Sequence, residues 1–316
     1  MDSQTNSRLQ ALSELSITSL DQVNRYLTAL EARNYAQTTL TSILSIIKKL
    51  LRSLPETSRQ RVCHNLARVT ADDLDVYIRA ARQQELTPST INYTLSMLKG
   101  FFAFLCEAGE MPRQPVIKRR HSLFAPEPLP KPMAEVDLVA FFKVIDSVRD
   151  RLLFLLMLRC GLRVSEACAI TWHNVDLGGG TALIKNGKGQ IDRTAYLSPD
   201  VVQTLQLWRA RGTTVQYVFP GRFPETSLSR KTAHELMQKY LREAGITKAY
   251  SPHCLRHSFA TQMLNAGVTL EALKELMGRH SLQMTLRYTQ LYESTKRQQY
   301  EHAMERIERR QAALGR

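Results

Sequence analysis

The sequence lacks several features that would place the protein in a membrane or in an oxidising compartment. Its longest apolar run, Leu152 to Leu158, is far shorter than the roughly 20 residues that a membrane-spanning helix needs. The first residues, MDSQTNSRLQ, contain no apolar h-region and do not resemble a signal peptide. The five cysteines are odd in number and form no CxxC pair, which argues against a disulfide framework and a zinc knuckle. We expect a cytoplasmic protein with no membrane partner, whose cysteines are small buried apolar residues.

Glycine is scarce in the first half of the chain. Only Gly100 and Gly109 precede residue 150, and the other twelve of the fourteen glycines follow it. The first part should therefore be helical, and the second should contain turns and strands. Apolar positions at helical spacing predict four helices in the first part, at 19–32, 36–53, 71–84 and 88–108. In the second part, WHNVDL, TALIK and RTAYL predict short strands, with Asn186-Gly187 as a hairpin turn among further helices.

Acidic residues are too few to balance the basic ones. The chain has 43 Lys plus Arg against 29 Asp plus Glu, a net charge of +14, and such an excess attracts polyanions, here nucleic acid. Six of the twelve prolines fall between Pro112 and Pro132, a stretch predicted to stay extended as a linker. This linker also contains three consecutive basic residues. We favour contact with a DNA backbone over a solvated tether with incidental charge for Lys118, Arg119 and Arg120.

The sequence also lacks the motifs of several familiar enzyme sites. It has no GxxxxGK[ST], no strand-borne GxGxxG, no HExxH and no GxSxG. The acidic residues of the second half are scattered among basic ones, which disfavours a two-metal nuclease. We therefore expect neither a nucleotide cofactor nor a metal.

The segment SPHCLRHSFATQ at 251–262 is the first candidate site. Ser251 can cap a helix with Pro252 at its first position, so that His253 and Arg256 project from one face of the opening turn. A helix N-terminus with an imidazole and a guanidinium suits a phosphate. A surface histidine beside a solvated arginine is the alternative. A zinc pair of His253 with His257 is disfavoured, because no third ligand is near in the sequence.

Three further segments of the sequence also contain candidate site residues. GLRVSEACAIT contains Arg163, the hairpin tip of KNGKGQIDR contains Lys188, and MGRHSLQMTLRYTQLY contains Tyr288. With these four boxes in order across most of residues 135–290, the sequence resembles the tyrosine recombinase, or phage integrase, family. The helical part before the linker is similar to the core-binding domain of that family.

The resemblance implies a multidomain fold. An all-α, four-helix, SAM-like core-binding domain that binds DNA would occupy residues 1–111, and the basic proline-rich linker would occupy 112–133. A mixed α/β, mainly helical catalytic domain with a small antiparallel sheet would occupy 134–316. About twenty residues precede the first predicted helix, which leaves little room for an additional arm-binding domain.

The resemblance also implies a mechanism and partners. Tyr288 would attack a DNA phosphate and leave a 3′-phosphotyrosyl link, while Arg163 and Arg256 clamp the non-bridging oxygens. Lys188 would protonate the departing 5′-oxygen, and His253 would assist proton transfer or hold the phosphate. The reaction needs no cofactor, metal or ATP. Implied partners are double-stranded DNA with short inverted-repeat sites and copies of the same chain in a tetramer on paired sites, with nucleoid association.

One position departs from the family pattern. The family has a histidine nine residues before the tyrosine, where this sequence has Arg279, and His280 follows one place late. Arg279 keeps the spacing and can donate to a phosphate, whereas His280 can do so if the turn shifts. Both residues remain candidates for the one role.

Three activities therefore remain open. The expected activity is site-specific recombination, in integration, excision or resolution, as a simple recombinase of a mobile element or of chromosome resolution. A relaxing enzyme of the type IB topoisomerase kind would share the chemistry. A DNA-binding regulator could have kept the fold and lost catalysis.

Overall fold

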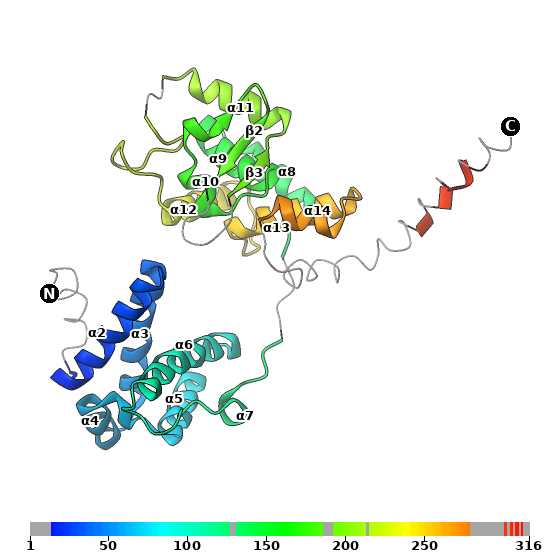
Figure 1. The fold of residues 1–316 in the computed structure, drawn as a ribbon. Helices are drawn as coiled ribbons and strands as arrows, with labels where there is room; N and C mark the ends of the chain where they lie inside the picture. Colours follow the sequence, from blue (N-terminus) through cyan, green and yellow to red (C-terminus); the bar gives the residue numbers. More distant parts are fainter. Residues whose placement is uncertain are drawn as a thin grey trace. The chain divides into compact units, whose positions relative to one another are not determined.

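The computed structural model of the 316-residue chain describes residues 14–126, 131–185, 192–212, 215–278 and scattered positions between 300 and 311. The chain divides into two compact units, Met1–Glu127 and Pro128–Arg316 (Figure 1). Within the described ranges, no helix is both long enough and apolar enough to cross a membrane.

The first unit is helical. Its elements are α2 (Ile17–Ala32), α3 (Gln37–Ser53), α4 (Glu56–His64), the 3-10 turn η2 (Leu66–Arg68), α5 (Ala71–Gln83) and α6 (Pro88–Glu107). The four helices predicted from apolar spacing are confirmed within one or two residues at each end. The short helix α4 was not predicted, because its sequence ETSRQRVCH buries only Val62.

Two cap residues explain where the last helices of this unit begin. The Thr70 side chain accepts from the backbone N–H of Asp73, and the Asp73 carboxylate accepts from the backbone N–H of Thr70, which closes a capping box. Thr87 caps α6, whose first residue is Pro88. The apolar faces of α3, α5 and α6 then meet in a core that contains the fully buried Phe102.

The proline-rich segment is not extended throughout, so that prediction is wrong at residues 118–121. These residues form the short helix α7 (Lys118–His121). The Asn92 amide holds the chain just beyond it, accepting from the backbone N–H of Leu123 at 2.9 Å and donating to its carbonyl oxygen at 2.7 Å. His121 is buried. Side-chain contacts with the first unit therefore fold this stretch onto that unit as far as Leu123.

The second unit combines helices with one small sheet. Its elements are α8 (Glu135–Lys143), α9 (Val148–Arg159), α10 (Val164–Ala169), the 3-10 turn η3 (Trp172–Asn174), β1 (Val175–Asp176), β2 (Thr181–Ile184), β3 (Arg193–Tyr196), α11 (Pro199–Arg209), α12 (Arg230–Glu243), α13 (Pro252–Asn265) and α14 (Leu270–Leu276). The strands pair antiparallel in the order β1-β2-β3, and Ile184 is opposite Arg193. The predicted mixed fold with a small antiparallel sheet is confirmed.

Helix α9 is the centre of this unit. Its run Leu152 to Leu158 is buried on every side, because α11 and α13 pack against it. At the start of α9, the buried Asp150 carboxylate accepts hydrogen bonds from the Tyr240 hydroxyl at 2.8 Å and from Nε of Arg149 at 2.7 Å. The longest apolar run of the sequence is therefore a core helix.

The expectation that all cysteines are buried holds for Cys160, Cys168 and Cys254, whereas Cys63 and Cys106 are only partly buried. Burial raises the pKa of Cys160 to about 12 and that of Cys168 to about 11. These two thiols therefore remain protonated near neutral pH and are poor nucleophiles.

Candidate phosphate-binding site

A sharp turn between α9 and α10 positions Arg163. Gly161 follows the end of α9 and has a φ of +62°, and a Cβ atom there would lie 2.5 Å from the Phe259 ring of α13. Only glycine permits both this backbone conformation and this close approach. The turn places Arg163 at the start of α10, where its backbone N–H donates to the Glu166 carboxylate at 2.8 Å.

Helix α13 positions the other two described candidates. Ser251 precedes its first residue, Pro252, and the opening turn presents His253 and Arg256, as the sequence predicts. Nη1 of Arg256 donates to the carbonyl oxygen of Gly161, and Nη2 donates to that of Met277 at 2.5 Å. These two bonds fix the plane of the guanidinium, and the Arg256 side chain is 5 % exposed.

Glu166 joins the arginines. Its carboxylate accepts from Nη1 of Arg163 at 2.5 Å and from Nη2 of Arg193 at 2.9 Å, and it lies 3.7 Å from Nη1 of Arg256. Burial alone would raise the pKa of Glu166. The hydrogen bond and charge of Arg193, the backbone N–H of Arg163 and the charge of Arg256 outweigh burial and lower this pKa. The buried carboxylate therefore stays ionised and offsets the repulsion among three cations.

His253 lies beside these charges. Its side chain is exposed, yet partial loss of hydration lowers its pKa, and the positive charges of Arg256 and Arg163 lower it further. The imidazole is therefore neutral near neutral pH and can accept a proton.

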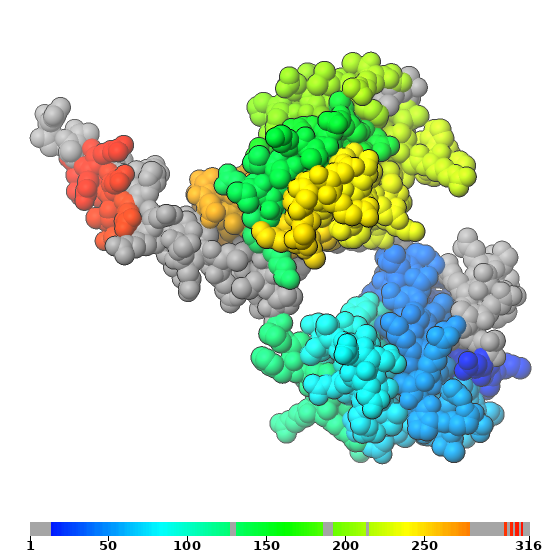
Figure 2. Space-filling model, turned by 180° about the vertical axis from the view of Figure 1, so that it is seen from behind, coloured from blue at the N-terminus to red at the C-terminus, as the bar shows by residue number. Residues whose placement is uncertain are grey.

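An open hollow of about 650 Å³ adjoins His253. It lies between the first turns of α12 and α13, and the N-terminus of a helix favours anions. In the space-filling view, α13 and the segment before it (yellow) form part of the exposed face of the second unit (Figure 2). Among the lining residues are Arg230, Lys231 and His234. No sequence motif identifies these three residues, although Ser229, the cap immediately before Arg-Lys, is a usable signal.

The remaining predicted catalytic residues lie outside the described residues. These are Lys188, Arg279, His280 and Tyr288. The last continuous range of described residues ends at Gly278, immediately before Arg279, and the Gly278 carbonyl oxygen accepts from Nη2 of Arg163 at 3.2 Å. The structure thus brings together Arg163, His253 and Arg256 with the turn that leads into the fourth box.

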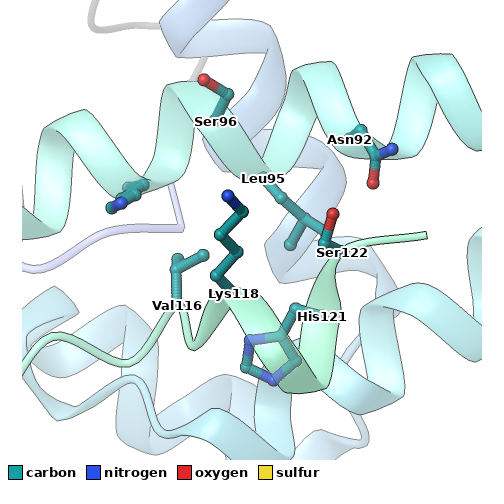
Figure 3. A pocket seen from close by; sticks show the side chains of 8 residues that line it. Asn92, Leu95, Ser96, Val116, Lys118, His121 and Ser122 are labelled. Atoms are coloured by element: carbon teal, nitrogen blue, oxygen red, sulfur yellow. The ribbon is translucent and has the colours of Figure 1, made fainter. Parts of the chain in front are cut away.

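The basic residues of α7 belong to the first unit. Arg120 is bound by two carboxylates, donating to Asp75 from Nε at 2.9 Å and also pairing with Asp72. Lys118 lines a hollow of about 290 Å³ together with Lys99 of α6. Figure 3 shows Lys118 extending from α7 towards α6, where Ser96 and Asn92 also line the hollow. Arg119 is exposed. Lys118 and Arg119 are therefore better placed than Arg120 to meet a phosphate.

Comparison with known proteins covers most of the chain. The phage integrase family matches residues 133–295, and the N-terminal SAM-like domain of phage integrases matches residues 51–109. The tyrosine recombinase XerA of Pyrococcus furiosus is 34 % identical over 229 residues, 70 % of this chain and 77 % of that protein. The tyrosine recombinase XerC of Xanthomonas campestris is 29 % identical over 254 residues, 78 % of each chain.

Two solved structures have the same fold. A lambda integrase dimer bound to a COC' core site matches with a TM-score of 0.68 and 17 % identity, over 91 % of this chain and 81 % of that one. The Tn1549 transposon integrase in complex with circular intermediate DNA matches with a TM-score of 0.67 and 18 % identity, over 84 % and 94 %. On the family match to more than half of its length and on its identity to XerA, the chain belongs to the phage integrase family, that of the tyrosine recombinases.

Proposed function

We propose that this protein is a site-specific DNA recombinase that cuts and rejoins strands through a 3′-phosphotyrosyl intermediate formed on Tyr288. The observation that supports this most strongly is the convergence of Arg163 and Arg256 on Glu166 and on the turn at Met277 and Gly278. Two guanidiniums held together by a buried carboxylate form a preorganised cationic site. Such a site stabilises the charge of a phosphodiester transition state without rearranging.

The chemistry balances within the chain and the DNA. The Tyr288 oxygen attacks phosphorus and forms the new P–O bond, and the bond from phosphorus to the 5′-oxygen breaks. The tyrosine proton passes to a base, a role we assign to neutral His253, and Lys188 gives a proton to the leaving 5′-oxygen. A 5′-hydroxyl from a second strand then reverses these steps and rejoins the DNA. Because the phosphotyrosyl link conserves the bond energy, the exchange needs no nucleotide cofactor.

Contacts with the DNA backbone follow from charge and exposure. Arg230 and Lys231 are exposed on the first turn of α12, beside the hollow at His253, and would neutralise phosphates next to the cleaved one. On the first unit, Lys118 and Lys99 line one hollow, and Arg119 adds a third cation to the proposed DNA-binding surface. The DNA in the lambda and Tn1549 integrase structures supports DNA as the partner.

The expected assembly is a tetramer of this chain on two DNA sites, each with short inverted repeats. One protomer cuts one strand, so exchange between two duplexes requires four active sites. The product would be integration, excision or resolution of a DNA element.

A nicked suicide substrate tests the proposal. A nick close to the cleaved phosphate lets the short fragment with the 5′-hydroxyl diffuse away, which traps the protein on DNA. We expect a covalent, denaturant-resistant complex that needs neither ATP nor an added metal ion, and a Holliday junction when two intact sites are supplied. No covalent complex would indicate a DNA-binding regulator instead. Relaxation of supercoiled DNA without a junction would indicate a topoisomerase-like enzyme.

A further inference from the structure

Arg193, the first residue of β3, makes contacts that no sequence motif suggested. Its side chain is 7 % exposed. Nε donates to the carbonyl oxygen of Leu276 at 3.1 Å, and Nη2 donates to the Glu166 carboxylate at 2.9 Å. These partners lie 83 and 27 positions away in the chain. A buried guanidinium therefore links the sheet, the start of α10 and the end of α14.

The end of α14 is held by three arginines on three consecutive carbonyl oxygens. Arg193 binds that of Leu276, Arg256 that of Met277, and Arg163 that of Gly278. The last carbonyls of a helix have no partner within it and favour cations. Two of the three arginines are the proposed phosphate ligands, and the third is Arg193.

Arg193 also lies directly against this turn. Gly278 adopts a φ of +57°, and a Cβ atom there would lie 2.6 Å from Cδ and 3.0 Å from Nε of Arg193. The turn is thus wrapped closely around the Arg193 side chain. In the sheet, Arg193 is paired with Ile184, the pair nearest the segment that connects β2 to β3. A shift of Arg193 must therefore move the turn, Glu166 or this end of the hairpin.

We infer that Arg193 is a positioning residue of this enzyme, which acts through Glu166 and the turn 276–278 to hold Arg163 and Arg256 in the geometry that binds the reacting phosphate. The inference rests on the proposed function for its effect on cleavage. It rests on the contacts alone for its effect on the turn. With its side chain 7 % exposed, Arg193 is placed to act through these partners rather than on the DNA itself.

Two variants and two controls test this role. Arg193→Met keeps the length of the side chain and removes every donor, and Arg193→Lys keeps one charged donor group for the case that the methionine variant does not fold. Arg159→Met makes the same chemical change at an exposed arginine of the second unit, paired with Asp200. Tyr240→Phe removes a buried hydrogen bond to Asp150. It is the control for a loss of stability that arises outside the site.

Hydrogen exchange measures how readily the backbone amides of the turn open, independently of any effect on activity. The backbone N–H of Met277 donates to Leu273, and that of Gly278 donates to Glu275, each at 2.9 Å. In Arg193→Met we expect these two amides to exchange about tenfold faster or more, with no change in α9. Neither control should alter their exchange. Unchanged exchange at both amides in Arg193→Met would overturn the inference, whatever the cleavage rate.

Single-turnover cleavage at saturating protein measures the effect on chemistry. A small misplacement of catalytic groups is expected to slow cleavage by about 10–100-fold in Arg193→Met, while the DNA dissociation constant stays within about threefold. Arg193→Lys should recover part of the rate. In a double-mutant cycle that combines Arg193→Met with Glu166→Gln, the double variant should lose less cleavage rate than the product of the two single losses. Both substitutions act through the same carboxylate.

These measurements separate the inference from the proposed function. If the wild-type protein forms no covalent DNA complex, the proposed function fails, and exchange at Met277 and Gly278 still decides whether Arg193 positions the turn. If the wild-type protein cleaves and Arg193→Met cleaves at the rate of Tyr240→Phe, the positioning role is wrong. Multiplicative losses in the cycle with Glu166→Gln would also overturn it.

Discussion

Nη2 of Arg163 lies 3.2 Å from the carbonyl oxygen of Gly278, and this hydrogen bond joins residues that are 115 positions apart in the chain. Arg163 opens α10, and Gly278 follows the end of α14. The bond therefore holds the first and the last of the four sequence boxes against each other. Arg163 also binds Glu166, so one guanidinium connects this turn to the buried carboxylate of the site.

The turn before Arg163 should not tolerate a side chain. Gly161→Ala places a Cβ atom 2.5 Å from the Phe259 ring and forces alanine into a φ of +62°. We expect the free energy of unfolding to fall by about 2–4 kcal/mol. The rate of DNA cleavage should also fall, because the Gly161 carbonyl oxygen holds the Arg256 guanidinium. Chemical denaturation and a suicide-substrate assay measure the two effects.

Gly245→Ala is the matched control for that substitution. Gly245 has a φ of +68°, and nothing lies within 4 Å of a Cβ atom placed there. The substitution should therefore lower the free energy of unfolding only through backbone strain, by about 1 kcal/mol. It should leave the rate of DNA cleavage unchanged. If the two variants lose equal stability, the contact with Phe259 does not restrict position 161.

Tyr288→Phe should abolish covalent complex formation and leave DNA binding intact. The substitution removes the nucleophilic oxygen and keeps the aromatic ring. Gel electrophoresis under denaturing conditions after incubation with a nicked substrate detects the complex, and a mobility-shift assay measures binding. Tyr292→Phe, one helical turn further along if that segment is helical, is the control and should remain active. A covalent complex formed by the Tyr288 variant would contradict the assignment, and Tyr292 would then be the next candidate.

Much of the fold could be predicted from local sequence signals. Helices such as α5 and α6 combine apolar residues at helical spacing with a capping threonine, and both signals lie within the segment itself. Helix α4 has one buried residue, so its sequence contains no periodic pattern to detect. Helix α7 depends on contacts between Arg120 and Asp75 and between Asn92 and Leu123, which are 45 and 31 positions apart. Sequence spacing does not reveal such contacts.

The residues of the candidate site also differ in how readily the sequence alone identifies them. Arg163, His253 and Arg256 lie within short boxes whose residue order is informative. Arg193 was not singled out, because its role depends on Leu276 and Glu166, far away in the chain. Glu166 lies within the box GLRVSEACAIT, yet only the fold shows that its carboxylate faces three arginines. A motif identifies the groups that meet the substrate more readily than the groups that hold them.

His253 predicts a pH dependence. Its pKa is lowered by partial desolvation and by the Arg256 and Arg163 charges, so the neutral imidazole persists below the usual value of about 6.5. If the neutral form accepts the tyrosine proton, the cleavage rate should fall only as the pH drops through the lowered pKa. Since the folded protein binds this proton less readily than the unfolded chain, the stability contributed by His253 is also lost as the pH falls below about 6.5.

Cleavage rates at protein concentrations below saturation report the ionisation of the free protein. On the acid side, we expect a limb with a midpoint below about 6.5 in the wild-type protein. His253→Gln should cleave more slowly and lack that limb. A limb that persists in the glutamine variant would assign the proton transfer to another group.

Arg279 and His280 are the two candidates for one proposed phosphate contact, and register favours Arg279. Gly278 followed by Arg279 keeps the family spacing of nine residues before Tyr288, whereas His280 would point about 100° further around if the segment were helical. A guanidinium is also a permanently charged donor. We expect Arg279→Ala to slow cleavage of a suicide substrate by about 10–1000-fold, by analogy with the loss of one oxyanion-hole donor. His280→Ala should cleave nearly normally. The positive φ of Gly278 gives the turn a conformation that could instead bring His280 forward, and the reverse pattern of rates would show that the histidine makes the contact from its shifted position.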